Sequence, residues 1–171
     1  MKHNKIALIG MMGSGKSTIS KLLSEKLGYS LFELDEIFEQ QEKIKIKDFF
    51  AKYKEEKFRK IEAEILKKSI KNDNFILSCG GGIILAKENR SILFENEILS
   101  IYLKTSPDNI FKRIKNDTSR PLLLAENPKQ EIEKILDSRE MYYNKAHIII
   151  ETDDKSQQKI LEEILEEIWK K

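Results

Sequence analysis

The chain has 171 residues, a length that suits a single domain spanning 1–171 with a sizeable core. Its 31 Lys and Arg residues nearly balance 29 Asp and Glu residues, so bulk charge does not favour nucleic acid or an anionic membrane as the main partner. The single cysteine excludes an internal disulfide and is typical of a reducing compartment. No apolar run is long enough for a membrane span or a signal peptide, and we therefore expect a cytoplasmic protein that acts as a monomer.

Short apolar runs alternate along the chain with longer segments of helical pattern. The apolar runs predict strands at 5–9, 30–34, 74–78, 98–103 and 147–151. The segments between them predict helices at 16–27, 54–71, 107–115, 129–144 and 157–169. Because the strand runs are nearly all apolar rather than alternating, both faces of each strand should be covered. This order predicts an α/β fold, a three-layer α/β/α domain with a five-stranded parallel sheet that binds ligands at the carboxyl ends of its strands.

The first predicted strand runs into the sequence GMMGSGKS at residues 10–17, which matches the phosphate-binding pattern G-x-x-x-x-G-K-[ST]. The match lies between a strand and a helix, which is the context that this pattern requires. Lys16 would reach the β- and γ-phosphates of a nucleoside triphosphate, and the Ser17 hydroxyl would bind Mg²⁺. The residues expected to bind the nucleotide here are Gly13, Ser14, Gly15, Lys16, Ser17 and Thr18.

Two carboxylates follow the second predicted strand, in the sequence FELDE. Glu33 and Asp35 are alternate residues, so on an extended segment their side chains would share one face. One carboxylate, Glu33, could help to hold Mg²⁺ through its water shell, and the other, Asp35, could accept a proton or a hydrogen bond from a substrate hydroxyl. The alternative interpretation is an acidic helix start, because carboxylates are favourable at helix N-termini.

Three consecutive glycines, Gly80, Gly81 and Gly82, follow the third predicted strand. Glycine costs backbone entropy on folding and contributes no side-chain packing. The three glycines therefore indicate either a flexible turn or a place where another group comes very close to the backbone. Their position just past a strand puts them on the expected binding edge of the sheet.

Several arginines stand among the many lysines. Arg59, Arg113 and Arg139 lie on three different predicted helices. Arg120 precedes a proline in the polar stretch 116–127, which has the length and position of a mobile lid. A lid arginine could stabilise charge on a transferred phosphoryl group, whereas each arginine taken alone is more typical of a solvated surface.

Taken in order, these motifs resemble the shikimate kinase family, which consists of small P-loop kinases with a nucleoside-monophosphate-kinase-like fold. The resemblance covers essentially the whole chain. Besides the phosphate loop it rests on F-R-x-x-E at 58–62, G-G-G at 80–82, R-P-L at 120–122 and R-x-x-x-Y at 139–143. It implies transfer of the γ-phosphoryl group of ATP to the 3-hydroxyl of shikimate, which gives shikimate 3-phosphate and ADP on the route to chorismate and the aromatic amino acids.

The resemblance also implies roles on the acceptor side, in a substrate-binding helical region at about 35–62. Shikimate is a small ring with one carboxylate and several hydroxyls. Arg59 and Arg139 would bind the carboxylate, because a planar guanidinium matches it better than an ammonium group does. Asp35 would bind ring hydroxyls and assist proton removal, and the N–H groups of Gly80, Gly81 and Gly82 would face the substrate.

On the nucleotide side the implied ligands are ATP and Mg²⁺. Lys16 and Arg120 would stabilise charge on the transferred phosphoryl group, and Arg113 would stack near the adenine. The family usually has Asp where this chain has Glu33, a departure that lengthens the carboxylate by one methylene. The loop after the last strand reads TDDK at 152–155, which leaves Lys155 or the backbone to contact the base.

Other functions remain open at this level. A related small-molecule kinase, such as gluconate kinase or a nucleoside monophosphate kinase, would share the phosphate loop. The monophosphate kinase would have to neutralise a second phosphate in a larger pocket. A non-catalytic ATP-binding switch module would bind ATP without transferring its phosphoryl group. A nucleic-acid-binding ATPase would need a basic stripe or an aromatic stacking surface, and neither is evident.

Overall fold

The computed structural model describes residues 3–95, 97–115 and 127–170. Five parallel strands form one sheet in the order β2-β3-β1-β4-β5, which confirms the predicted α/β fold. The strands are β1 Lys5–Ile9, β2 Ser30–Glu33, β3 Phe75–Ser78, β4 Leu99–Lys104 and β5 Ile148–Glu151. Because β1 is the central strand, the phosphate loop that follows it leaves the middle of the carboxyl edge.

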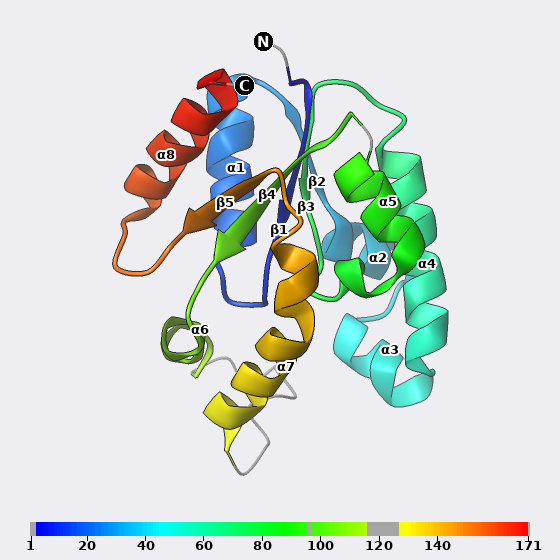
Figure 1. Cartoon of the computed structure of the whole chain (residues 1–171). Coiled ribbons are helices and arrows are strands. Elements are labelled where there is room, and N and C mark those ends of the chain that lie inside the picture. The colour runs from blue at the N-terminus through cyan, green and yellow to red at the C-terminus, as the bar shows by residue number, and fades with distance from the viewer. Residues whose placement is uncertain (1–2, 96, 116–126, 171) are drawn as a thin grey trace.

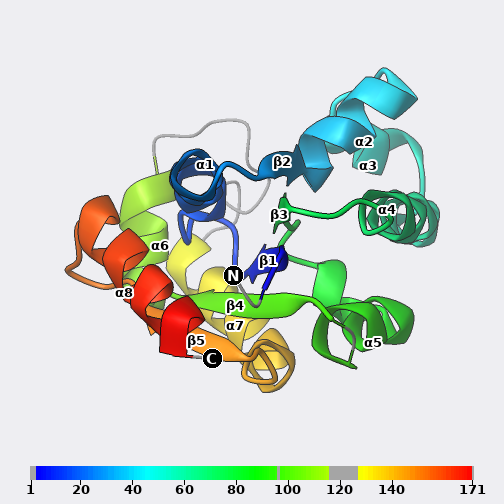
Figure 2. The same cartoon turned by 90° about the horizontal axis from the view of Figure 1, so that it is seen from above.

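Helices cover both faces of this sheet (Figures 1 and 2). α1 and α8 lie side by side on one face, α5 and α7 cover the other, and α2, α3 and α4 form a group beside β2 and β3. The helices are α1 Lys16–Leu27, α2 Leu34–Glu42, α3 Ile46–Lys52, α4 Glu55–Ser69, the 3₁₀ turn η1 Ile83–Leu85, α5 Lys87–Glu95, α6 Pro107–Ile114, α7 Pro128–Tyr143 and α8 Gln157–Lys170.

Each face of the sheet has its own apolar core, because successive residues of a strand point to opposite sides. Ile6 and Leu8 of β1 pack with α1 and α8, whereas Ala7 and Ile9 pack with the helices of the other face. All four are fully buried. The continuous apolar runs in the sequence therefore correspond to strands covered on both sides.

The sequence prediction was incomplete between the first and fourth strands. It missed α2 and α3 as separate helices, and it missed α5, whose sequence KENRSILFE buries only Asn89 and Leu93. It was also wrong about the residues after β2, which ends at Glu33, so that Asp35 lies in the first turn of α2 and not on an extended segment. Asp35 thus occupies the acidic helix start that was the alternative interpretation.

Within the described residues, every helix is too short or too polar to cross a lipid bilayer.

Candidate active site

The phosphate loop closes tightly around the start of α1. Gly13 and Gly15 have φ values of 76° and 94°, which favour glycine. A Cβ atom on Gly13 would also lie 2.7 Å from Cγ2 of Ile114. Lys16 opens the helix, and its Nζ donates hydrogen bonds to the carbonyl oxygens of Gly10 and Met11, both at 2.9 Å. Nucleotide phosphates bound in the loop would compete with these carbonyls for the ammonium group.

The two residues predicted to hold Mg²⁺ are neighbours in space. Ser17 Oγ of α1 donates to Glu33 Oε2 at the end of β2, over 3.2 Å. Hydroxyl, carboxylate and phosphate oxygens are the ligands that Mg²⁺ prefers, and this cation usually keeps several waters. The longer side chain of Glu33 therefore still brings its carboxylate to the hydroxyl of the phosphate loop.

A hollow of about 680 Å³ lies on the nucleotide side of the loop. Five residues predicted to bind the nucleotide line it, namely Ser14, Gly15, Thr18, Arg113 and Lys155. Arg113 joins two elements there, because its guanidinium donates to the carbonyl oxygens of Gly13 at 3.3 Å and Thr152 at 3.4 Å. Lys155 is held by an ion pair with Glu163 at 2.7 Å.

The three glycines beyond β3 are crowded by side chains of the chain itself. None of them has a positive φ, so a left-handed turn does not explain them. A Cβ on Gly80 would lie 2.7 Å from Oδ1 of Asp35 and 3.0 Å from Oε1 of Glu62. A Cβ on Gly82 would overlap Arg59, at 2.6 Å from Cζ and Nη1. The glycines thus leave room for side chains of the chain itself, among them the predicted acceptor-binding residues Asp35 and Arg59.

Arg59 is held in place by two carboxylates on its own helix. Its Nη1 donates to Oε2 of Glu62 at 2.8 Å, and its Nη2 donates to Oε1 of Glu55 at 2.9 Å. Burial alone would lower the pKa of the Arg59 guanidinium, but the two carboxylates raise it above its ordinary value. The guanidinium is therefore charged and fixed in direction before any acceptor arrives.

Glu62 received no role from the sequence, although it belongs to the F-R-x-x-E motif. It is 4% exposed, and its Oε1 makes no hydrogen bond to the part of the chain that the structure describes. Burial raises the pKa of the Glu62 carboxyl, and the charges of Arg59 and Arg139 act against that rise. A signal was present in the sequence, because a Glu three residues after an Arg on a helix shares its face.

Arg139 reaches the same place from α7. Its Nη1 donates to the carbonyl oxygen of Gly81 at 3.4 Å and lies 4.0 Å from Sδ of Met11 in the phosphate loop. The Tyr143 hydroxyl donates to the same Gly81 carbonyl. Arg59 lies against Gly82, and Nη1 of Arg139 lies against the adjacent Gly81, so the structure brings the two predicted carboxylate-binding arginines to neighbouring positions.

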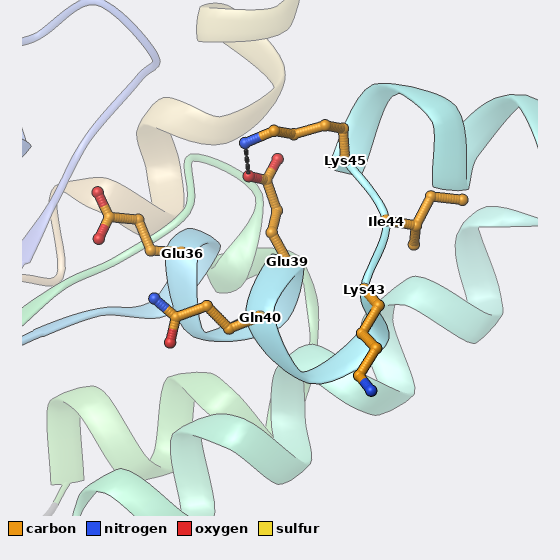
Figure 3. A pocket seen from close by; sticks show the side chains of 6 residues that line it. All are labelled: Glu36, Glu39, Gln40, Lys43, Ile44 and Lys45. Carbon is orange, nitrogen blue, oxygen red and sulfur yellow. Dashed lines mark hydrogen bonds and ion pairs between the residues drawn. The ribbon is translucent and has the colours of Figure 1, made fainter.

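A second hollow, of about 470 Å³, lies along α2 and the segment before α3 (Figure 3). Figure 3 shows the ion pair that spans it, in which Lys45 Nζ donates to Glu39 Oε2 at 2.6 Å. The other oxygen of Glu39 accepts the N–H of Ile46, the first residue of α3, at 3.0 Å. Glu39 therefore stabilises the turn between the two helices, and the hollow contains none of the predicted site residues.

Arg120 and residues 116–126 of the predicted lid lie outside the described residues. Cys79, which directly precedes the glycines, is 2% exposed, and burial raises the pKa of its thiol. A thiol in this state is unreactive and acts as a small apolar residue in the core.

A phosphate loop after the central strand of a five-stranded parallel sheet, with Asp35, Arg59 and Arg139 at the glycines beside it, is the arrangement of a P-loop kinase. The model of the family described as "Shikimate kinase" matches residues 12–169. A shikimate kinase of Dehalococcoides mccartyi is 42% identical over 168 residues, which are 98% of this chain and 94% of the relative. One of Thermodesulfovibrio yellowstonii is 36% identical over 162 residues, 95% and 93% of the two chains. The chain belongs to the shikimate kinase family, and it is an ATP-dependent kinase.

Solved structures agree with this assignment. The structure of a shikimate kinase from Acinetobacter baumannii in complex with shikimate is similar with a TM-score of 0.92 and 32% identity, and the match covers 98% of this chain and 94% of the other. A gluconokinase from Sinorhizobium meliloti is similar with a TM-score of 0.60 and 14% identity, over 99% and 93% of the two chains. The second likeness shows the fold alone, so the gluconate kinase alternative has less support than shikimate kinase.

Proposed function

We propose that the residues around the three glycines bind shikimate and present its 3-hydroxyl to the γ-phosphate of ATP. One observation carries this proposal: Gly81, the middle glycine, packs directly against the phosphate loop. A Cβ on Gly81 would lie 3.3 Å from the backbone N of Met12 and 3.4 Å from the carbonyl oxygen of Gly10. A small acceptor held by Arg59 and Arg139 would therefore lie directly beside bound phosphate.

Carboxylate recognition falls to the two arginines. Glu55 and Glu62 already hold the guanidinium of Arg59, so little side-chain freedom is lost when a carboxylate binds it. Arg139 lies against Gly81, and Arg59 lies against its neighbour Gly82. Two guanidinium groups at adjacent glycines suit one planar carboxylate.

The glycines supply hydrogen-bond donors. The N–H groups of Gly80, Gly81 and Gly82 donate to no acceptor among the described residues, and Gly80 and Gly82 are buried. Buried N–H groups are rarely left unpaired in native proteins. We infer that they pair with oxygens of the bound acceptor.

Phosphoryl transfer needs a proton acceptor and a stabiliser of negative charge. Asp35 lies against Gly80, where its carboxylate would take the proton of the 3-hydroxyl as that oxygen attacks the γ-phosphorus and ADP departs. Lys16 would leave the carbonyls of Gly10 and Met11 to neutralise charge on the phosphoryl oxygens. From the resemblance, Arg120 would add a second positive charge.

Ser17 and Glu33 would hold Mg²⁺, and their contact at 3.2 Å places a hydroxyl and a carboxylate together as this cation requires. When bound, Mg²⁺ neutralises charge on the β- and γ-phosphates. Arg113 and Lys155 would bind the adenine side of ATP, since both line the hollow behind the phosphate loop. We also propose that the protein is a monomer and that it works in the cytoplasm, where a single buried cysteine suits the reducing environment.

The test is ADP release from ATP and Mg²⁺, measured with shikimate, quinate, gluconate and nucleoside monophosphates one at a time. We expect strong release with shikimate alone. Lys16→Ala should reduce kcat by roughly 1,000-fold or more, whereas Lys21→Ala, on an exposed position of the same helix, should be as active as the wild type. Release with another acceptor only, or normal turnover by Lys16→Ala, would overturn the proposal.

A further inference from the structure

The backbone from Gly80 to Leu85 has every carbonyl oxygen engaged in a hydrogen bond. Two of these bonds are local: Ile83 N donates to Gly80 O at 3.1 Å, and Leu85 N donates to Gly82 O at 3.0 Å. The other four carbonyls, those of Gly81, Ile83, Ile84 and Leu85, accept from side chains of α5 and α7. A loop that kept only its local bonds would leave these four oxygens to water or to the acceptor.

α5 supplies two adjacent donors. Asn89 is fully buried, and its Nδ2 donates to Ile83 O at 3.1 Å. Arg90 Nη1 donates to both Ile84 O and Leu85 O at 2.8 Å. The Arg90 guanidinium also lies over the ring of Tyr142, 4.3 Å from its centroid, so a contact with α7 limits its movement.

α7 supplies the donor to Gly81, the middle glycine. Tyr143 is fully buried, and its ring stacks on that of Tyr102 with centroids 4.9 Å apart and planes 17° apart. Its hydroxyl donates to Gly81 O, the carbonyl that Arg139 also contacts. Burial raises the pKa of Tyr143 to about 12, so the hydroxyl keeps its proton at neutral pH.

We propose that Tyr143, Asn89 and Arg90 are positioning residues, which hold the carbonyls of Gly81, Ile83, Ile84 and Leu85 so that the N–H groups of the glycines face the acceptor. None of the three needs to touch the acceptor. The proposal rests on the proposed function, because that function gives the glycine N–H groups their partner. Its consequence is specific: loosening the segment weakens acceptor binding and leaves ATP binding intact.

The test compares Tyr143→Phe with Tyr102→Phe. Both substitutions remove one buried hydroxyl from the same stacked pair, but the hydroxyl of Tyr102 has no hydrogen-bond partner among the described residues. Tyr143→Phe should raise the KM and the calorimetric Kd for shikimate by about 3- to 10-fold, the loss of one hydrogen bond, with the KM for ATP unchanged. Tyr102→Phe should leave the KM for both substrates at the wild-type value.

The α5 donors give a second pair of variants. Arg90→Met should raise the shikimate KM by a similar factor. Arg90→Lys, which keeps a donor and a charge, should recover part of the loss. If both variants behave alike, or if any variant weakens ATP and shikimate binding equally, the residues have only a general structural role and the proposal is wrong.

Amide hydrogen exchange of the ligand-free protein separates this proposal from the proposed function. Tyr143→Phe should speed exchange in the peptide covering 80–86, and Tyr102→Phe should not. Unchanged exchange there would overturn the positioning role even if shikimate is the acceptor. Faster exchange in a protein that does not phosphorylate shikimate would support the positioning of the loop and refute only the proposed function.

Discussion

Replacing Gly82 by alanine tests how the glycines and Arg59 fit together. The new Cβ would lie 2.6 Å from Cζ and Nη1 of Arg59, whereas carbon atoms in contact need about 3.5 Å. The guanidinium must therefore retreat by roughly 1 Å. That movement would break or lengthen its 2.8 Å bond to Glu62 and turn it away from Arg139.

The magnitude follows from the bonds at risk. A hydrogen bond to a charged group contributes about 1.5–3 kcal/mol, so Gly82→Ala should weaken shikimate binding by roughly 10- to 100-fold. Gly82 has φ −97° and ψ 1°, which alanine also adopts, so the backbone itself adds little cost. The disturbed pair of Arg59 and the buried Glu62 should lower the free energy of unfolding by about 1.5–3 kcal/mol.

The assay is steady-state ADP release with shikimate varied at saturating ATP and then the reverse, together with thermal unfolding. Gly81→Ala is the comparison variant, because its Cβ would press on the backbone of Gly10 and Met12 in the phosphate loop. It should raise the KM for ATP as well as that for shikimate. A Gly82→Ala protein with an unchanged shikimate KM, or with equal losses for both substrates, would refute the reasoning.

Two further predictions concern buried polar groups. Burial raises the folded-state pKa of Glu62 above its ordinary value of 4.5, so the charged form is disfavoured on folding and the wild type loses stability as pH rises through that raised value. The unfolding temperature of Glu62→Gln minus that of the wild type should therefore increase from pH 4 upward and then level off. A difference that stays constant with pH would contradict the raised pKa of Glu62. Thr105 and Thr152 share a buried hydrogen bond at 2.6 Å. Thr152→Val should cost about 1–3 kcal/mol in unfolding free energy, because it leaves the Thr105 hydroxyl unpaired, and adding Thr105→Val should restore part of that loss. Chemical denaturation of the single and double variants measures both effects. A second loss that simply adds to the first would be evidence against the hydrogen bond.

Local pattern was enough to predict the phosphate loop and the sheet. GMMGSGKS forms one continuous loop, and its phosphate binding depends on consecutive residues, so the sequence alone reveals it. The apolar runs likewise predict buried parallel strands, because being covered on both faces demands apolar residues throughout. The pairing of Arg59 with Glu62 is also local, since three residues on a helix bring two side chains to one face.

Helices of weak pattern were not predicted. α5 buries only Asn89 and Leu93, so its sequence lacks the apolar stripe that indicates a helix. Asp35 was expected on an extended segment because nothing in FELDE marks where β2 ends. α2 packs against α4, and a contact between separate helices is not visible in the local pattern.

The sequence by itself determined that this protein binds a nucleotide phosphate at the centre of a parallel α/β sheet. It could not determine why three glycines follow β3, because the groups that need their space come from α2 and α4. Nor could it show that side chains of α5 and α7 fix the same segment. Contacts between distant parts of the chain depend on how the helices pack around the sheet, and only the tertiary structure brings Asp35, Arg59 and Arg139 to one edge of it.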